Sequence, residues 1–206
     1  MVKKIFLIFI GVSLILLTVV IIISSTIQYI KKDNEIDVSN KEIKLEVMKN
    51  RNTNKINIDD TSVSEEEISN KIFEEKVLLK ECEKRNIDIE DETKQELKKV
   101  TFNNPISDEN MKVISNMNMT EEEFRNYLYN KLIDMQLRVN LKKELLEEIT
   151  TNNIKINNQE FKQKVKNFNE YKNSENVNID ETIQNAENLL NEYITILEKQ
   201  YTKVQK

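Results

Sequence analysis

The pattern of apolar and polar positions divides the chain into two unequal parts. Residues 5–23 form an uninterrupted apolar stretch, with a lysine pair just before it and another shortly after it. A helix needs about 20 residues to cross the core of a bilayer. This pattern predicts a single N-terminal transmembrane helix within residues 1–32. From residue 33 onward the chain is polar and heavily charged, and we expect it to form one body in water.

A cleaved signal peptide is the alternative interpretation of residues 1–32. Such a peptide has an apolar region of about 7–15 residues and a small-x-small cleavage site, whereas this stretch is longer and offers only Ser24-Ser25-Thr26. We therefore prefer an uncleaved anchor, with the lipid bilayer as its partner. Lysines at both ends leave the orientation open. A short N-terminal flank usually stays in the cytoplasm, so we expect a single-pass protein of the cell membrane with an extracytoplasmic C-terminal body.

After the expected anchor, apolar and polar residues alternate with a period of two, which is typical of strands. Apolar and polar residues alternate in two short runs, which contain Ile43, Leu45 and Val47 and then Ile56 and Ile58. A turn-rich cluster separates the runs. We therefore predict a short β-hairpin at the start of the body.

The rest of the chain has the three- and four-residue apolar spacing of amphipathic helices. Three expected starts carry the capping-box pattern, in which Ser, Thr or Asn precedes Glu by three residues. The pairs are Ser64 with Glu67, Thr120 with Glu123, and Asn157 with Glu160. The first helix is expected to end near residue 85. The second is the longest, to about residue 149, and places Phe124, Leu128, Met135, Leu145 and Ile149 near one face.

Shorter helices are expected at about 91–100 and after Pro105 and Ser107. A last helix is expected from about residue 180, with an apolar stripe formed by Ile183, Ala186, Leu190, Tyr193, Leu197 and Val204. The predicted fold class is mostly α. The predicted domains are an anchor at 1–32, a juxtamembrane linker with a short strand at 33–54, and a helical domain at 55–206. A simple coiled coil is the second choice, because no strict heptad pattern is sustained.

Composition removes several classes of function. The chain has no histidine, which is the commonest general base and metal ligand. Its single cysteine, Cys82, lies at an apolar helical position and is expected to be buried. The net charge is −5, and no basic stripe with interleaved aromatics indicates nucleic-acid binding. No nucleotide-binding, metalloprotease or nucleophile-elbow motif occurs. We therefore predict no catalytic residues, no metal, no cofactor and no enzymatic activity.

Four motifs occur in a fixed order. They are Ser64-Glu65-Glu66-Glu67, Lys84-Arg85-Asn86-Ile87, Met119-Thr120-Glu121-Glu122-Glu123-Phe124-Arg125 and Ile156-Asn157-Asn158-Gln159-Glu160-Phe161. Their order and spacing resemble the N-terminal chaperone domain of the SurA- and PrsA-type extracytoplasmic foldases, over roughly residues 55–204. The resemblance implies a SurA-like helical domain on which the C-terminal helix packs.

Two departures from that family matter. Asp60 and Asn86 occupy positions where the family often has glycine, and both residue types tolerate a left-handed backbone. The parvulin isomerase domain has no room between Tyr171 and Asp180. The resemblance therefore implies a chaperone that lacks prolyl isomerase activity.

The leading hypothesis is a membrane-anchored chaperone or holdase that binds unfolded or exported polypeptides. Phe102, Met117 and Met119 are the predicted client-binding residues, with core filling as the other interpretation of the methionines. The alternative function is a bitopic scaffold in a division or sporulation complex. A second copy of the chain or another membrane protein would then be the partner.

Overall fold

Seven helices and two short strands make up the part of the chain that the structure describes. The computed structural model describes residues 33–53, 64–174 and 177–205. The chain separates into two compact units, residues 1–35 and 36–206, and the second unit carries the fold described below. In chain order the elements are β1 (Glu35–Val38), α2 (Asn40–Thr53), α3 (Glu65–Arg85), α4 (Asp91–Asn103), α5 (Asp108–Asn116), α6 (Glu121–Thr150), α7 (Gln159–Lys172), α8 (Ile179–Glu198) and β2 (Thr202–Gln205).

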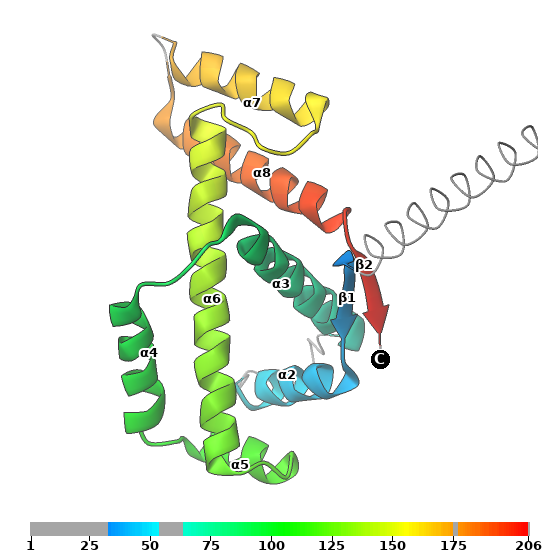
Figure 1. Cartoon of the computed structure of the whole chain (residues 1–206), viewed down its shortest axis with the longest axis vertical. Helices are drawn as coiled ribbons and strands as arrows, with labels where there is room; N and C mark the ends of the chain where they lie inside the picture. Colours follow the sequence, from blue (N-terminus) through cyan, green and yellow to red (C-terminus); the bar gives the residue numbers. More distant parts are fainter. Residues whose placement is uncertain (1–32, 54–63, 175–176, 206) are drawn as a thin grey trace, which may run out of the picture. The chain divides into compact units, whose positions relative to one another are not determined.

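The longest helix, α6, organises this unit. Its 30 residues give it a length of roughly 45 Å at 1.5 Å per residue. Four other helices, α3, α4, α7 and α8, pack against it, as Figure 1 shows. The mostly helical prediction is confirmed, and α6 is, as predicted, the longest helix among the residues that the structure describes.

Two predicted capping boxes are confirmed. The Ser64 hydroxyl accepts a hydrogen bond from the Glu67 backbone N–H at 3.1 Å, and the Glu67 carboxylate accepts one from the Ser64 N–H at 2.8 Å. Thr120 and Glu123 make the same reciprocal pair at the start of α6. These bonds satisfy backbone donors that a helix start otherwise leaves without partners. The third predicted box is wrong, because the Asn158 side chain, and not that of Asn157, caps α7, and the residue three positions later is Phe161, which has no side-chain acceptor to complete a box.

Helix α3 ends at Arg85, where the sequence predicts its end. Asn86 has the left-handed conformation (φ 56°, ψ 39°), which is expected at a position where the foldases that the sequence resembles often have glycine. The Ile87 N–H returns to the Cys82 carbonyl at 2.9 Å, which closes the helix end. Asp60, the other such position, lies outside the described residues. Cys82 is buried as expected, and burial raises the pKa of its thiol to about 11.

The predicted strand at residues 43–47 is wrong, because this segment belongs to helix α2. The alternation arises because α2 is buried on two faces. Ile43 and Val47, four residues apart, pack with α3, while Leu45 packs on the other side with α5 and α6. The second predicted strand, at 56–58, lies outside the described residues.

A cap at the start of α2 escaped the sequence analysis. The Ser39 N–H donates to the Glu42 carboxylate at 3.0 Å, and the Glu42 N–H donates to the Ser39 hydroxyl at 3.3 Å. This is the same Ser-x-x-Glu pattern that marked α3. The linker and strand predicted for residues 33–54 leave no helix start there, so the sequence prediction lacks this cap.

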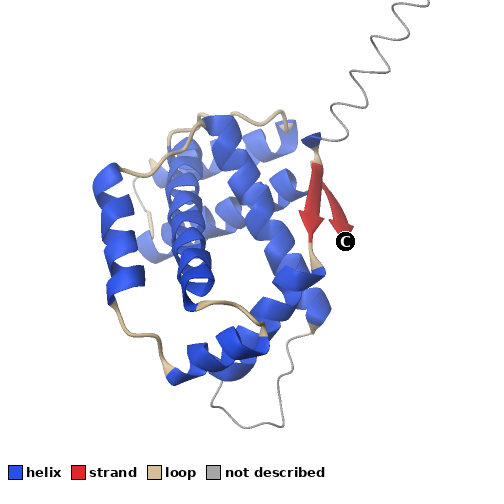
Figure 2. Ribbon diagram, turned by 60° about the horizontal axis from the view of Figure 1, so that its bottom comes forward, coloured by secondary structure: helices blue, strands red, loops and turns tan. Residues whose placement is uncertain are grey.

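The two strands lie at opposite ends of the described sequence and pair with each other, so neither is part of a hairpin between neighbouring segments. β1 and β2 make a short parallel sheet, and Figure 2 shows them side by side. Val204, predicted as part of the last helix, lies in β2 because α8 ends at Glu198. The sheet therefore joins the beginning of the body to its end.

The expectation of a membrane-spanning helix needs correction. No helix within residues 33–53, 64–174 and 177–205 is both long and apolar enough to cross a membrane. The transmembrane part of the predicted fold class and the predicted cell-membrane location are therefore withdrawn. The segment on which they rested, residues 1–32, lies outside the described residues.

A buried ionic network joins α3, α6 and α8 inside the largest apolar cluster. The Arg85 guanidinium contacts the Glu148 carboxylate and donates to the Tyr193 hydroxyl at 3.1 Å. The Tyr193 hydroxyl in turn donates to the other Glu148 oxygen at 2.7 Å. Arg85 also pairs with Glu81 at 2.7 Å and with Glu144 at 3.1 Å. The Arg85 and Glu148 side chains are only 8% and 5% exposed.

Replacing Glu148 with Gln should lower the free energy of unfolding by about 3 kcal/mol, because Arg85 stays buried with one carboxylate fewer. Urea unfolding followed by circular dichroism measures this loss. Glu147→Gln is the matched control, because Glu147 is the exposed neighbour on the same helix. Equal stabilities of the two variants would contradict the role of the network.

Acid should narrow the stability difference between the wild type and Glu148→Gln. Burial by itself raises the pKa of Glu148, but hydrogen bonds from Tyr193, Arg85 and Lys155 outweigh it and hold this pKa below 4.5. A carboxyl with a depressed folded pKa stabilises the fold above its unfolded pKa and loses that contribution as the pH falls through its folded pKa. Urea unfolding at a series of pH values from 7 to below 4.5 checks this. A difference that stays constant with pH would argue against it.

Candidate functional site

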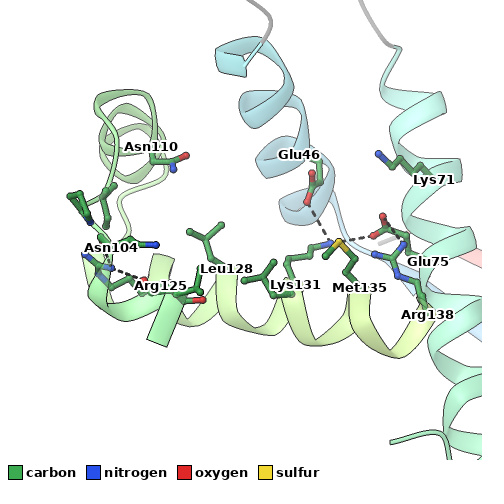
Figure 3. Close-up of a pocket in the computed structure, with 15 residues that line it drawn as sticks. Glu46, Lys71, Glu75, Asn104, Asn110, Arg125, Leu128, Lys131, Met135 and Arg138 are labelled. Carbon is green, nitrogen blue, oxygen red and sulfur yellow. Dashed lines mark hydrogen bonds and ion pairs between the residues drawn. The ribbon is translucent and has the colours of Figure 1, made fainter. Parts of the chain in front are cut away.

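A cavity of about 430 Å³ lies on α6 between α2, α3 and the α4–α5 segment, and we call it the α6 cavity (Figure 3). Its apolar lining consists of Val100, Pro105, Ile106, Leu128, Leu132 and Met135. Its charged lining consists of Glu46, Lys71, Glu75, Arg125, Lys131 and Arg138, and the remaining lining residues are Thr101, Asn104 and Asn110. The volume falls within the range of about 300–1,000 Å³ that is usual for ligand pockets.

The spacing of residues along α6 produces the floor of the cavity. Arg125, Leu128, Leu132, Met135 and Arg138 follow one another at three- and four-residue steps, which places them on one face of the helix. Figure 3 shows the labelled members of this row directed to the same side of α6. The floor therefore has three apolar side chains in its middle and a long cationic side chain at each end.

Arg125 fastens one wall of the cavity. Its Nη1 group donates to the backbone carbonyl oxygens of Thr101 at 2.6 Å, Phe102 at 3.3 Å and Asn104 at 3.0 Å. These carbonyls lie at the C-terminal end of α4, where a helix leaves acceptors without internal partners. Glu121, one turn earlier on α6, pairs with the same guanidinium at 2.8 Å. The end of α4 is thus held over α6 by hydrogen bonds from one side chain.

Ion pairs hold the opposite wall. Lys131 lies 3.5 Å from the Glu46 carboxylate on α2 and 3.4 Å from that of Glu75 on α3. Arg138 pairs with Glu75 at 3.1 Å. The Tyr127 hydroxyl donates to Glu46 at 2.6 Å, and burial together with this carboxylate raises the pKa of Tyr127. The two carboxylates of the cavity are therefore already paired with cations.

Two apolar lining residues, one on the floor and one on α4, stay open to solvent despite these walls. Met135 is 49% exposed and Val100 is 55% exposed. Apolar groups left accessible in a hollow provide a surface that a ligand can cover. The arrangement is suited to holding a ligand with apolar and charged groups. In residues 33–53, 64–174 and 177–205, no group of three or more His, Cys, Asp or Glu side chains converges for a metal ion.

The client-binding residues predicted from the sequence lie elsewhere. Met117 and Met119 are half-buried and pack together against the cluster around Phe124 and Val113, which is the core-filling interpretation. Phe102 is half-buried near the end of α4, and its carbonyl is one of the acceptors of Arg125. None of the three lines the α6 cavity. Their role in binding stays a prediction.

The residues of the α6 cavity were only partly visible in the sequence. The sequence places Leu128 and Met135 on the same apolar face of the long helix as Leu145 and Ile149, and it does not separate the part of that face that lines the cavity from the part that is buried. The signal that distinguishes this half of the helix is the presence of Arg125, Lys131 and Arg138 beside the apolar positions. Farther along, Leu141, Leu145 and Ile149 are fully buried.

In comparisons with known proteins, no family model, no curated protein and no solved structure matches this chain. The resemblance to the SurA- and PrsA-type foldases therefore stays a prediction.

Replacing Arg125 with Gln should loosen the end of α4. Hydrogen bonds from a charged donor contribute about 1.5–3 kcal/mol each, so a local loss of about 2 kcal/mol should speed amide exchange roughly 30-fold. Hydrogen–deuterium exchange across residues 100–103 measures this effect. Lys99→Gln is the control, because Lys99 is exposed on the same helix and is not a partner of Arg125. Unchanged exchange in the Arg125 variant would contradict the proposed fastening.

Proposed function

We propose that this protein is a non-enzymatic polypeptide-binding protein of the holdase type. It binds unfolded segments of other proteins weakly and reversibly in the α6 cavity. The observation that carries this proposal is the apolar floor between charged walls, formed by the half-buried Leu128 and Leu132 and the exposed Met135. Binding would occur by burial of apolar side chains, with no bond made or broken.

The size and openness of the cavity favour weak binding. Each large apolar side chain buried there contributes about 1.5–3 kcal/mol. Two such side chains contribute about 3–6 kcal/mol, which the cost of association reduces further. A protein that must release its clients without an energy source needs contacts of this strength.

The packing of the last helix also supports the proposal. α8 folds back onto α3 and α6, and β2 pairs with β1. The resemblance to the SurA- and PrsA-type foldases implies such an arrangement, whereas a single extended rod would favour the scaffold alternative. The same resemblance, without an isomerase insert, leads us to expect no acceleration of prolyl isomerisation by the purified protein.

A scaffold remains the second candidate because apolar residues are exposed outside the cavity. Val139 is 52% exposed on α6, and Ile179 and Ile183 are exposed one turn apart at the start of α8. A scaffold would co-purify with one defined partner in fixed stoichiometry. A holdase would instead show many weak clients.

Replacing Met135 with Glu should remove most of the ability of the full chain to suppress aggregation of a chemically unfolded client. A carboxylate on the cavity floor would have to be desolvated when an apolar segment covers it. Light scattering at several-fold molar excess of the protein measures suppression. A several-fold loss relative to the wild type is expected.

Val139→Glu is the matched control. Val139 lies one turn farther along α6, has nearly the same exposure, and does not line the cavity. It should suppress aggregation as well as the wild type does. Equal losses in both variants would move the binding surface away from the cavity, and no suppression by the wild type would refute the proposed function.

A further inference from the structure

The α6 cavity carries a positive charge that contrasts with the rest of the chain. Four cations line it, namely Lys71, Arg125, Lys131 and Arg138, against the two carboxylates of Glu46 and Glu75. The whole chain has a net charge of −5. Cations are therefore concentrated around this apolar floor.

The cations of the cavity are not equally engaged. Lys131 and Arg138 neutralise Glu46 and Glu75, and Arg125 is held by Glu121 and the end of α4. Lys71 is exposed and makes no hydrogen bond or ion pair with any residue that the structure describes. Figure 3 shows its ammonium end extending away from α3 on the side of the cavity. One lysine thus remains available for an anionic ligand group next to the apolar floor.

We infer that the α6 cavity selects polypeptide segments in which an aspartate or glutamate adjoins large apolar residues. This inference rests on the proposed function and specifies its ligand. The apolar side chains of the segment would cover Leu132 and Met135, and the carboxylate would lie beside Lys71. Glu46 and Glu75 are already paired with Lys131 and Arg138. Their electrostatic repulsion of an acidic ligand is therefore weaker than that of two unpaired carboxylates.

The size of the cavity restricts the occupant to a short segment of chain. About 430 Å³ holds a few side chains and is too small for a folded domain. Complementary charge across such a site contributes to selectivity more than to raw affinity. Since Lys71 is exposed to solvent, salt should weaken its contribution.

The test uses three fluorescent peptides that share the same apolar residues and carry Asp, Asn or Lys at two flanking positions. Fluorescence anisotropy with the full chain measures the three dissociation constants. The Asp peptide should bind about threefold more tightly than the Asn peptide and about tenfold more tightly than the Lys peptide, in line with exposed ion pairs. Raising the salt concentration should shrink these ratios.

Two charge-reversal variants test whether the preference for the Asp peptide depends on Lys71. Lys71→Glu should abolish or invert the preference for the Asp peptide, and Lys71→Gln should weaken it. Lys142→Glu changes the net charge equally, but Lys142 is an exposed residue of α6 outside the cavity, so the preference should persist. Circular dichroism of each variant confirms that the helical content is unchanged.

The outcomes separate this inference from the proposed function. Equal binding of the three peptides by the wild type would overturn the acidic preference and leave polypeptide binding intact. Equal effects of Lys71→Glu and Lys142→Glu would assign the preference to net charge and overturn the role of Lys71. If no peptide binds at all, the proposed function itself is wrong.

Discussion

The structure depends on the buried contact of Arg85 with Glu148 and Tyr193. It joins the end of α3, the last turns of α6 and the C-terminal half of α8, three segments that are distant in the sequence. Glu148 also accepts a hydrogen bond from the Lys155 N–H, which ties the α6–α7 connection to the same point. A buried ion pair adds little net stability over an apolar core, but an incomplete one is costly. We interpret the network as the feature that specifies a single position for α8.

The two halves of α6 serve different purposes. Toward the C-terminal end of α6, Leu141, Leu145 and Ile149 are buried in the apolar cluster that α6 shares with α3, α7 and α8. The Arg85 network lies in the same region. In its first half, neighbouring elements are held at the sides by Arg125 and Lys131, and the apolar row from Leu128 to Met135 stays accessible. The polar contacts of Arg125 and Lys131 fix the walls of the cavity at a distance from each other. Close apolar packing between the same elements would instead fill the cavity. The buried half and the half that lines the cavity are thus two parts of the same helix.

The sequence predicted features that depend on neighbouring residues. The caps at Ser64 and Thr120 and the left-handed turn at Asn86 follow from residue types within one helical turn. Features that depend on distant partners were missed. Residues 43–47 look like a strand only because α2 is buried on two faces, and β1 pairs with a strand at the opposite end of the body. The cavity draws its lining from α2, α3, α4, α5 and α6, so no local pattern could reveal it.

The central claim is that clients occupy the α6 cavity. Methyl NMR of the full chain with labelled methionines tests it most directly, since Met135 lines the cavity while Met117 and Met119 pack in the core. Addition of an unfolded client should shift or broaden the Met135 resonance and leave those of Met117 and Met119 unchanged. An unperturbed Met135 resonance at saturating client, or a change confined to Met117 and Met119, would contradict the account.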